Sequence, residues 1–152
     1  VETGDWGVVE AAERAGKEQG RARDGVAVGL PAMVRAFKLQ KRAARVGLDG
    51  PDVGHVIDQI AEEAAEVVEA RDTLTQDEVT EEVGDLLFVM ANLARHLNVD
   101  PEVALRQANA KFQRRFEFIE DALARDGRAP SDSDLAEMDG LWDAAKRVEK
   151  GA

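Results

Sequence analysis

Apolar residues recur along this chain at the three-to-four-residue spacing of amphipathic helices, and no segment alternates like a half-buried strand. The pattern predicts helices over residues 31–46, 52–72, 75–98, 101–125 and from about 134 to 148. Their boundaries have three kinds of local signal: a first-turn proline, an N-cap side chain, or a glycine or asparagine past the end. The signals are Pro31, Gly47, Asp52, the Thr75/Glu78 capping-box pair, Asn98, Asp100 with Pro101, Gly127, Pro130, and Ser131 or Ser133 ahead of the last helix.

The first part of the chain lacks this regularity. Residues 1–29 are interpreted as a linker or N-terminal arm, with a short helix near 6–18, ahead of one domain over residues 30–150. A chain of 152 residues is long enough for a single independent core. Because it opens with Val1 and not Met, we expect it to be a piece of a longer protein.

Composition narrows the classes of function. With 31 acidic against 20 basic residues the net charge is −11, which argues against nucleic acid as the ligand. No run approaches the roughly 20 apolar residues of a membrane span, and no signal-peptide order is present, so a soluble cytoplasmic protein is expected. Cysteine is absent and histidine occurs only twice, so any metal must be bound through carboxylates.

Two predicted helices each contain a pair of acidic residues three positions apart: Glu63 with Glu66, and Glu82 with Asp85. In an antiparallel hairpin folded about residue 74, Glu66 lies level with Glu82, and Glu63 with Asp85. Glu82 also falls inside the apolar stripe of its helix. Clustered carboxylates repel one another unless cations compensate, and Mg²⁺, then Mn²⁺, are the natural partners. The alternative is a solvated acidic face, the commonest state of any single Glu.

Basic and aromatic residues near the C-terminus could bind a phosphate and a base. Lys111 and Arg115 lie one turn apart, and so do Trp142 and Lys146. Core packing for Trp142 and solubility for the basic residues are the plainer interpretations. His96, near a helix end, is expected to satisfy terminal carbonyls and not to approach a ligand. Glycine-rich phosphate loops and nucleophile triads are absent.

Six segments together resemble the MazG nucleoside triphosphate pyrophosphohydrolases, over about residues 30–150. They are Leu30-Pro31-Ala32-Met33, Lys41 to Gly47, Glu62-Glu63 with Glu66-Val67, Glu81 to Phe88, Asn92 to His96, and Asn109 to Phe112 with Arg114-Arg115-Phe116. Many MazG proteins contain two such domains, and this chain resembles the second, catalytically competent one.

The resemblance implies an all-α antiparallel bundle of about five helices, completed by homodimerisation. It also implies Mg²⁺-dependent hydrolysis of ribonucleoside or deoxyribonucleoside triphosphates to a monophosphate and pyrophosphate, as nucleotide-pool housecleaning. By resemblance, the residues divide into three roles. The metal ligands would be Glu63, Glu66, Glu82 and Asp85, and the substrate-binding residues would be Lys111, Arg114, Arg115, Trp142, Lys146 and Asn92. The catalytic residues would be Glu62, which would orient or deprotonate water, together with Glu63, Lys111 and Arg115.

Two alternatives stay open. One is a pyrophosphohydrolase of the same superfamily specific for dUTP, phosphoribosyl-ATP, or a damaged or signalling nucleotide. The other is a non-catalytic helical dimerisation module, whose acidic residues form only a solvated rim. A substrate panel distinguishes the first, and a calorimetric titration with Mg²⁺ distinguishes the second, because a rim has no saturable site.

Overall fold

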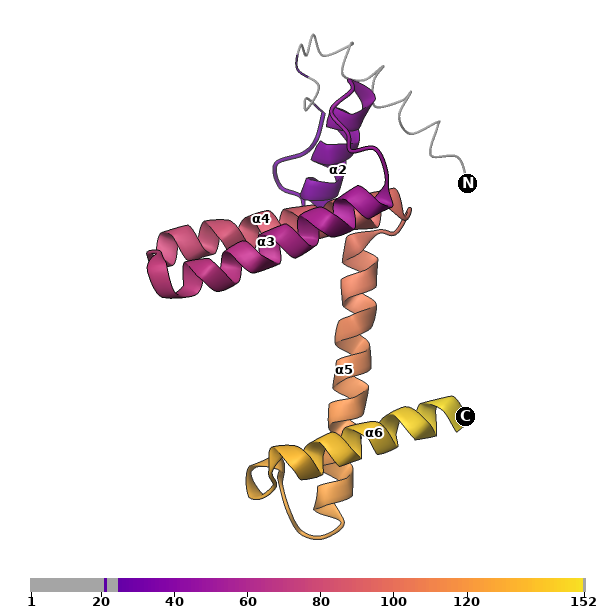
Figure 1. Cartoon of the computed structure of the whole chain (residues 1–152). Coiled ribbons are helices and arrows are strands. Elements are labelled where there is room, and N and C mark those ends of the chain that lie inside the picture. The colour runs from indigo at the N-terminus through magenta and orange to yellow at the C-terminus, as the bar shows by residue number, and fades with distance from the viewer. Residues whose placement is uncertain (1–20, 22–24, 152) are drawn as a thin grey trace. The chain divides into compact units, whose positions relative to one another are not determined.

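All regular structure in the described part of the chain is helical (Figure 1). The computed structural model describes Arg21 and residues 25–151. These residues form α2 (Ala32–Arg45), α3 (Val53–Thr73), α4 (Gln76–His96), α5 (Pro101–Ala124), the 3-10 turn η1 (Pro130–Asp132) and α6 (Leu135–Gly151). The predicted all-α class with five helices is therefore confirmed, and the helix expected near 6–18 lies outside the described residues. None of the helices described is long and apolar enough to cross a bilayer.

The predicted capping residues act at the helix ends. Asp52 accepts a hydrogen bond from the backbone N–H of His55 at 2.8 Å, which satisfies one of the free donors at the start of α3. Thr75 and Glu78 form the reciprocal capping box that begins α4. After α4, Asn98 has a φ of 56°, the left-handed conformation that asparagine tolerates better than most residues. These local contacts explain why the helix boundaries follow the sequence signals closely.

The start of α6 differs in detail from the sequence expectation. The helix begins at Leu135, after both of the serines that were predicted to precede it, and Asp134 provides the N-terminal contact by accepting from the backbone N–H of Glu137 at 2.8 Å. Ser133 instead donates its hydroxyl to the Glu137 carboxylate. An aspartate reaches the free N–H groups of a first turn as well as a serine does, so composition alone could not rank the two.

Helices α3 and α4 form an antiparallel hairpin, and α2 packs against α4 (Figure 1). They belong to a compact unit that ends at Glu102. Val56, Ala70 and Ala91 are buried where these helices meet, and small side chains there let the backbones approach closely. Gln40 ties α2 to α4 by donating from Nε2 to the carbonyl oxygen of Phe88 at 3.0 Å.

The second compact unit begins at Val103 and contains most of α5, η1 and α6. Its buried apolar residues are Ile119, Leu123 and Ala145. The turn before α6 is held by an ion pair between Arg128 Nη2 and Glu137 Oε1, 2.7 Å apart. Hydrogen bonds from Arg128 and then Ser133 lower the pKa of Glu137 to about 2.

Candidate functional site

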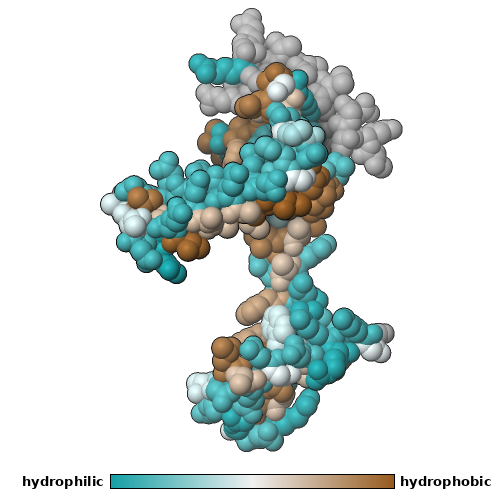
Figure 2. All heavy atoms as spheres, viewed as in Figure 1, coloured by the Kyte–Doolittle hydropathy of each residue, from teal (hydrophilic) through white to brown (hydrophobic). Residues whose placement is uncertain are grey.

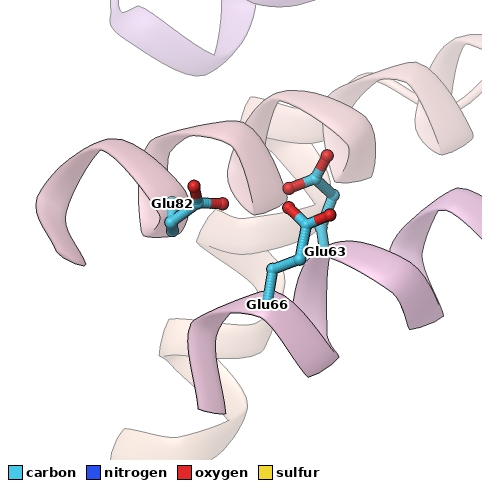
Figure 3. A group of neighbouring side chains, drawn as sticks. All are labelled: Glu63, Glu66 and Glu82. Carbon is cyan, nitrogen blue, oxygen red and sulfur yellow. The ribbon is translucent and has the colours of Figure 1, made fainter. Parts of the chain in front are cut away.

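Three glutamates of the hairpin come together as an acidic group, defined here as Glu63, Glu66 and Glu82 (Figure 3). Each contributes one carboxylate oxygen, and the three oxygens lie within 4.8 Å of one another. Glu63 and Glu66 extend from α3, and Glu82 extends from α4. The hairpin therefore brings Glu66 level with Glu82, as the register about residue 74 predicts.

The short turn is the reason for this register. Leu74 and Thr75 alone join α3 to α4, so the two helices have little freedom to slide past one another. Glu66 and Glu82 are each eight residues from position 74, which is about 12 Å along a helix at 1.5 Å per residue. Helices of this length must therefore place both residues at the same height.

The acidic group is partly withdrawn from water. Glu63 and Glu82 are half-buried, whereas Glu66 is exposed. The Oε2 atoms of Glu63 and Glu82 are both buried without a hydrogen-bond partner. Buried carboxylate oxygens normally have a partner, and a proton or a cation would provide one for each of these two atoms.

Burial and repulsion together disfavour the ionised carboxylates. The pKa of Glu63 is raised, first by burial and then by repulsion from Glu66 and Asp85. The pKa of Glu82 is raised by burial first, and next by a hydrogen bond and repulsion from Glu66. A divalent cation would reverse both effects, because it would neutralise the repulsion and supply the missing partners.

Asp85 and Glu62 lie beside the acidic group. Asp85 is exposed and is not one of the three residues with converging oxygens, yet it is close enough to raise the pKa of both Glu63 and Glu82. Glu62 is also exposed and repels Glu63 electrostatically. Glu63 and Asp85, predicted to lie level, are thus close enough to repel one another, but Asp85 does not belong to the group of converging oxygens.

The acidic group fits a hard divalent cation such as Mg²⁺ or Mn²⁺. All of its donors are carboxylate oxygens, the ligand type that these ions prefer. Two of those oxygens have no partner within the described protein. No His or Cys belongs to the group, so the donor set does not resemble that of a structural zinc site.

In the second unit, α5 and α6 bring together Arg115, Trp142, Phe112 and Glu149. The Arg115 guanidinium lies 5.2 Å from the centroid of the Trp142 ring, in a cation–π arrangement. Its Nε and Nη2 atoms donate to Glu149 Oε2 at 3.2 and 2.9 Å. The Trp142 ring also packs on Phe112, with 5.7 Å between the ring centroids. Trp142 therefore contacts one face of the Arg115 guanidinium, and Glu149 accepts hydrogen bonds from its Nε and Nη2 atoms. The Nη1 atom does not bind Glu149.

Sequence inspection missed Glu149. It lies seven residues after Trp142, on the same face of α6, and that spacing was the signal that could have identified it. Arg115 lowers the pKa of Glu149 mainly through the hydrogen bonds, and Arg114 and Lys111 add attraction. Lys111 and Arg114 are themselves exposed on α5, and Lys146 is exposed on α6. Arg115, Arg114 and Lys111 thus all act electrostatically on the Glu149 carboxylate.

Asn92 and Arg95 line a pocket of about 550 Å³ between α2, the loop after it, α3 and α4. This cavity is called the α4 pocket below. Arg95 donates to the Asn92 side-chain oxygen at 2.9 Å and is also paired with the Asp49 carboxylate.

The expectation for His96 is wrong: its Nε2 lies 3.2 Å from Asp49 Oδ1 and does not bind a helix-terminal carbonyl. Asp49, in the loop, was not singled out because loop acids carry no periodic signal.

Comparison with known proteins agrees with this geometry. Residues 54–118 match the model of the MazG nucleotide pyrophosphohydrolase domain. The chain is 44% identical over 146 residues to the nucleoside triphosphate pyrophosphohydrolase of Escherichia coli K12, covering 95% of this chain and 56% of that protein. It is 38% identical over 141 residues to the nucleoside triphosphate pyrophosphohydrolase/pyrophosphatase MazG of Thermotoga maritima, covering 93% and 54%.

The chain thus spans little more than half the length of these two relatives. The chain is also 44% identical over 69 residues to the uncharacterized protein YabN of Bacillus subtilis, a match that covers 45% of this chain and 14% of that protein. The segment that matches the family model contains all three members of the acidic group and also Asp85. Residues 54–118 therefore match the MazG nucleotide pyrophosphohydrolase domain, and most of the chain is similar to one part of the two longer relatives.

Proposed function

We propose that this chain hydrolyses ribonucleoside or deoxyribonucleoside triphosphates between the α- and β-phosphates, releasing a nucleoside monophosphate and pyrophosphate. The observation that carries the proposal is the acidic group, with its two buried, unpartnered oxygens, inside the segment that matches the MazG model. The names of the relatives from E. coli and T. maritima agree with it. Housecleaning of the cytoplasmic nucleotide pool is the role that suits this activity.

In the proposed reaction, Glu63, Glu66 and Glu82 would hold Mg²⁺, Asp85 would be a further ligand, and Mn²⁺ could substitute for Mg²⁺. The cation would supply charge neutralisation at the phosphates and would acidify the attacking water. Glu62, exposed beside Glu63, is proposed to orient that water or accept its proton. The oxygen of water then bonds to the α-phosphorus as the bond to the bridging oxygen breaks, so that the electron pair leaves with pyrophosphate.

Basic residues of the second unit are proposed to bind the phosphates. The Arg115 Nη1 atom, together with Lys111 and Arg114, would bind phosphate oxygens and neutralise the charge that develops on the leaving pyrophosphate. Lys146 would add positive charge from α6. Trp142 holds the Arg115 guanidinium in place, and we propose that its exposed part contacts the nucleotide.

A hydrolysis assay over the four ribonucleoside and four deoxyribonucleoside triphosphates, with and without Mg²⁺, tests the proposal. We expect monophosphate and pyrophosphate as the first products, little early orthophosphate, and no turnover without a divalent cation. In ¹⁸O-labelled water the label should enter the monophosphate. If a diphosphate and orthophosphate form first, attack occurs at the γ-phosphorus and the proposed reaction is wrong. Calorimetry with Mg²⁺ then decides whether a metal site exists at all.

We also propose that the chain forms a homodimer through the hairpin. Large apolar side chains stay exposed along α4 at helical spacing, with Val83 39%, Leu87 47% and Met90 46% exposed. On α3, Ile57 and Val68 are 52% and 59% exposed. Figure 2 shows hydrophobic patches bordering the mostly hydrophilic visible face of the hairpin. A second copy would bury these residues, and a symmetric dimer is the commonest way to do so.

The dimer has a direct test. Light scattering should give twice the mass of one chain, and the melting temperature should fall when the protein is diluted a hundredfold, because dissociation favours unfolding at low concentration. Leu87→Gln together with Met90→Gln should yield a monomer. A wild-type monomer with a concentration-independent melting temperature would contradict the proposal.

A further inference from the structure

The α4 pocket begins one helical turn along the hairpin from Glu63 of the acidic group and from the neighbouring Asp85. Gln59, which lines the pocket, is four residues before Glu63 on α3, and Val89 is four residues after Asp85 on α4. Four residues span about 6 Å of helix. If the acidic group acts at an α-phosphorus, this displacement matches the ribose that separates the α-phosphorus from the base. The pocket is therefore placed where the base of a bound nucleotide would lie.

The lining of the α4 pocket is of the kind that receives a flat heterocycle. Leu39, Phe88 and Val89 provide apolar contacts, and the amides of Gln40, Gln59 and Asn92 provide hydrogen-bonding groups. Its volume of about 550 Å³ lies within the range of pockets for small organic ligands, roughly 300–1,000 Å³. Asp49, His55 and Arg95 also line the pocket, so six of its twelve lining residues are polar. Fixed polar groups give orientation and specificity to a ligand site.

The Asn92 amide has only one orientation in this setting. Arg95 Nε donates to Asn92 Oδ1 at 2.9 Å, and because a guanidinium has no acceptor, the oxygen must face Arg95. Arg95 is in turn held by Asp49, and its side chain is only 14% exposed. The Nδ2 amino group is thus turned to the other side as a donor. It makes no hydrogen bond to any residue in the described part of the chain.

The Gln40 amide also has one orientation, but here the amino group is used by the protein and the oxygen remains as the hydrogen-bonding group. Its Nε2 donates to the carbonyl oxygens of Phe88 at 3.0 Å and Ala36 at 3.2 Å, which leaves Oε1 as an acceptor. Among the residues that line the pocket, Asn92 thus has a fixed amide donor and Gln40 a fixed amide acceptor. Guanine, thymine and uracil have a keto oxygen next to an imino N–H. The keto oxygen can accept from the Asn92 donor while the imino N–H donates to the Gln40 acceptor. Adenine and cytosine, in the same pose, would place an amino donor against the Asn92 donor.

We propose that the α4 pocket binds the nucleobase and that Asn92 makes it prefer keto bases over amino bases. This inference rests on the proposed function for the identity of the ligand. Asn92 is here a specificity-determining residue, and Arg95 and Asp49 are positioning residues that hold its amide. A base with a donor at this point leaves two donors facing one another without an acceptor, and an unsatisfied buried donor is costly.

The matched substrate pair is dUTP and dCTP, which differ only in the keto and amino pattern of the ring. For the wild type, kcat/KM should be at least about tenfold higher for dUTP than for dCTP. Asn92→Asp keeps the oxygen that faces Arg95 and replaces the Nδ2 donor by a carboxylate oxygen. It should reverse the preference, so that the ratio of the dCTP to the dUTP kcat/KM rises at least about a hundredfold. Gln76→Glu makes the same charge change at the other end of α4 and should leave the ratio unchanged.

Direct binding separates this inference from the proposed reaction. Calorimetry with dUMP and dCMP, without a divalent cation, should show the same preference and the same reversal in Asn92→Asp. If no triphosphate is hydrolysed but the monophosphates bind with this preference, the proposed function fails and the base site stands. If hydrolysis occurs and dCTP is used as well as dUTP, the base-site inference is wrong. Should Asn92→Asp not fold, Asn92→Leu replaces it, and the dUTP to dCTP ratio should then fall to about one.

Discussion

Glu82→Gln should lower the rate of nucleotide hydrolysis by at least ~10²-fold, the scale for losing a key electrostatic contact or disturbing a metal site. The side chain keeps its size but loses the charge that would hold the cation. Because Glu82 is half-buried and crowded by Glu63 and Glu66, the change also removes a repelled charge. The metal-free protein should therefore melt at the same temperature as the wild type or higher.

The neighbouring Glu81 provides the matched control. It is exposed and does not belong to the acidic group, so Glu81→Gln should retain nearly full turnover and the wild-type response to Mg²⁺. Thermal melting with increasing Mg²⁺ adds a readout that needs no substrate. The wild type and Glu81→Gln should be stabilised by the cation, and Glu82→Gln should not. Wild-type turnover in Glu82→Gln would contradict the metal-site assignment.

Arg115→Ala should lower kcat/KM for nucleoside triphosphates by about 10²-fold, because it removes a charge-assisted contact to the phosphates. Mg²⁺ binding by the acidic group should not change, since none of its members is on α5. Arg115→Lys keeps the charge but loses the fork of donors that Glu149 and a phosphate would share. We expect it to restore only part of the activity.

Arg125, exposed in the turn just after α5, is the control for a general loss of positive charge, and Arg125→Ala should behave like the wild type. Melting temperatures must accompany the kinetics, because Arg115 also packs on Trp142. An Arg115→Ala protein that folds, binds Mg²⁺ and turns over at the wild-type rate would rule out the proposed phosphate contact. A parallel loss in Arg125→Ala would show that long-range charge alone is responsible.

Helix class and boundaries could be predicted from the sequence because their causes are local. Asp52 and the Thr75/Glu78 pair bind backbone groups within three residues, and Pro101 suits a first turn by its own ring geometry. The apolar spacing identifies each helix face for the same reason. Even the register of Glu66 with Glu82 follows from local information, because a turn of two residues leaves the hairpin almost no freedom to slide.

Other features depend on residues that are distant in the chain. Asp49 and Arg95 are 46 positions apart, and Glu149 and Arg115 are 34 apart, so no local pattern joins either pair. The α4 pocket needs α2, a loop and both hairpin helices before it exists. The orientation of the Asn92 amide likewise depends on a guanidinium that Asp49 holds from outside α4.

The sequence by itself thus determined the helices, their ends and the acidic positions on the hairpin, because hydrogen bonds within a few residues and the helical repeat decide them. Only the tertiary structure decided that Glu63 and Glu82 lose the hydration of one oxygen each, and that Asp85 stays outside the converging group. It also decided which side chains orient Arg115 and Asn92. Burial and side-chain partners arise from packing between helices, and the amino-acid order alone does not specify how closely two faces meet.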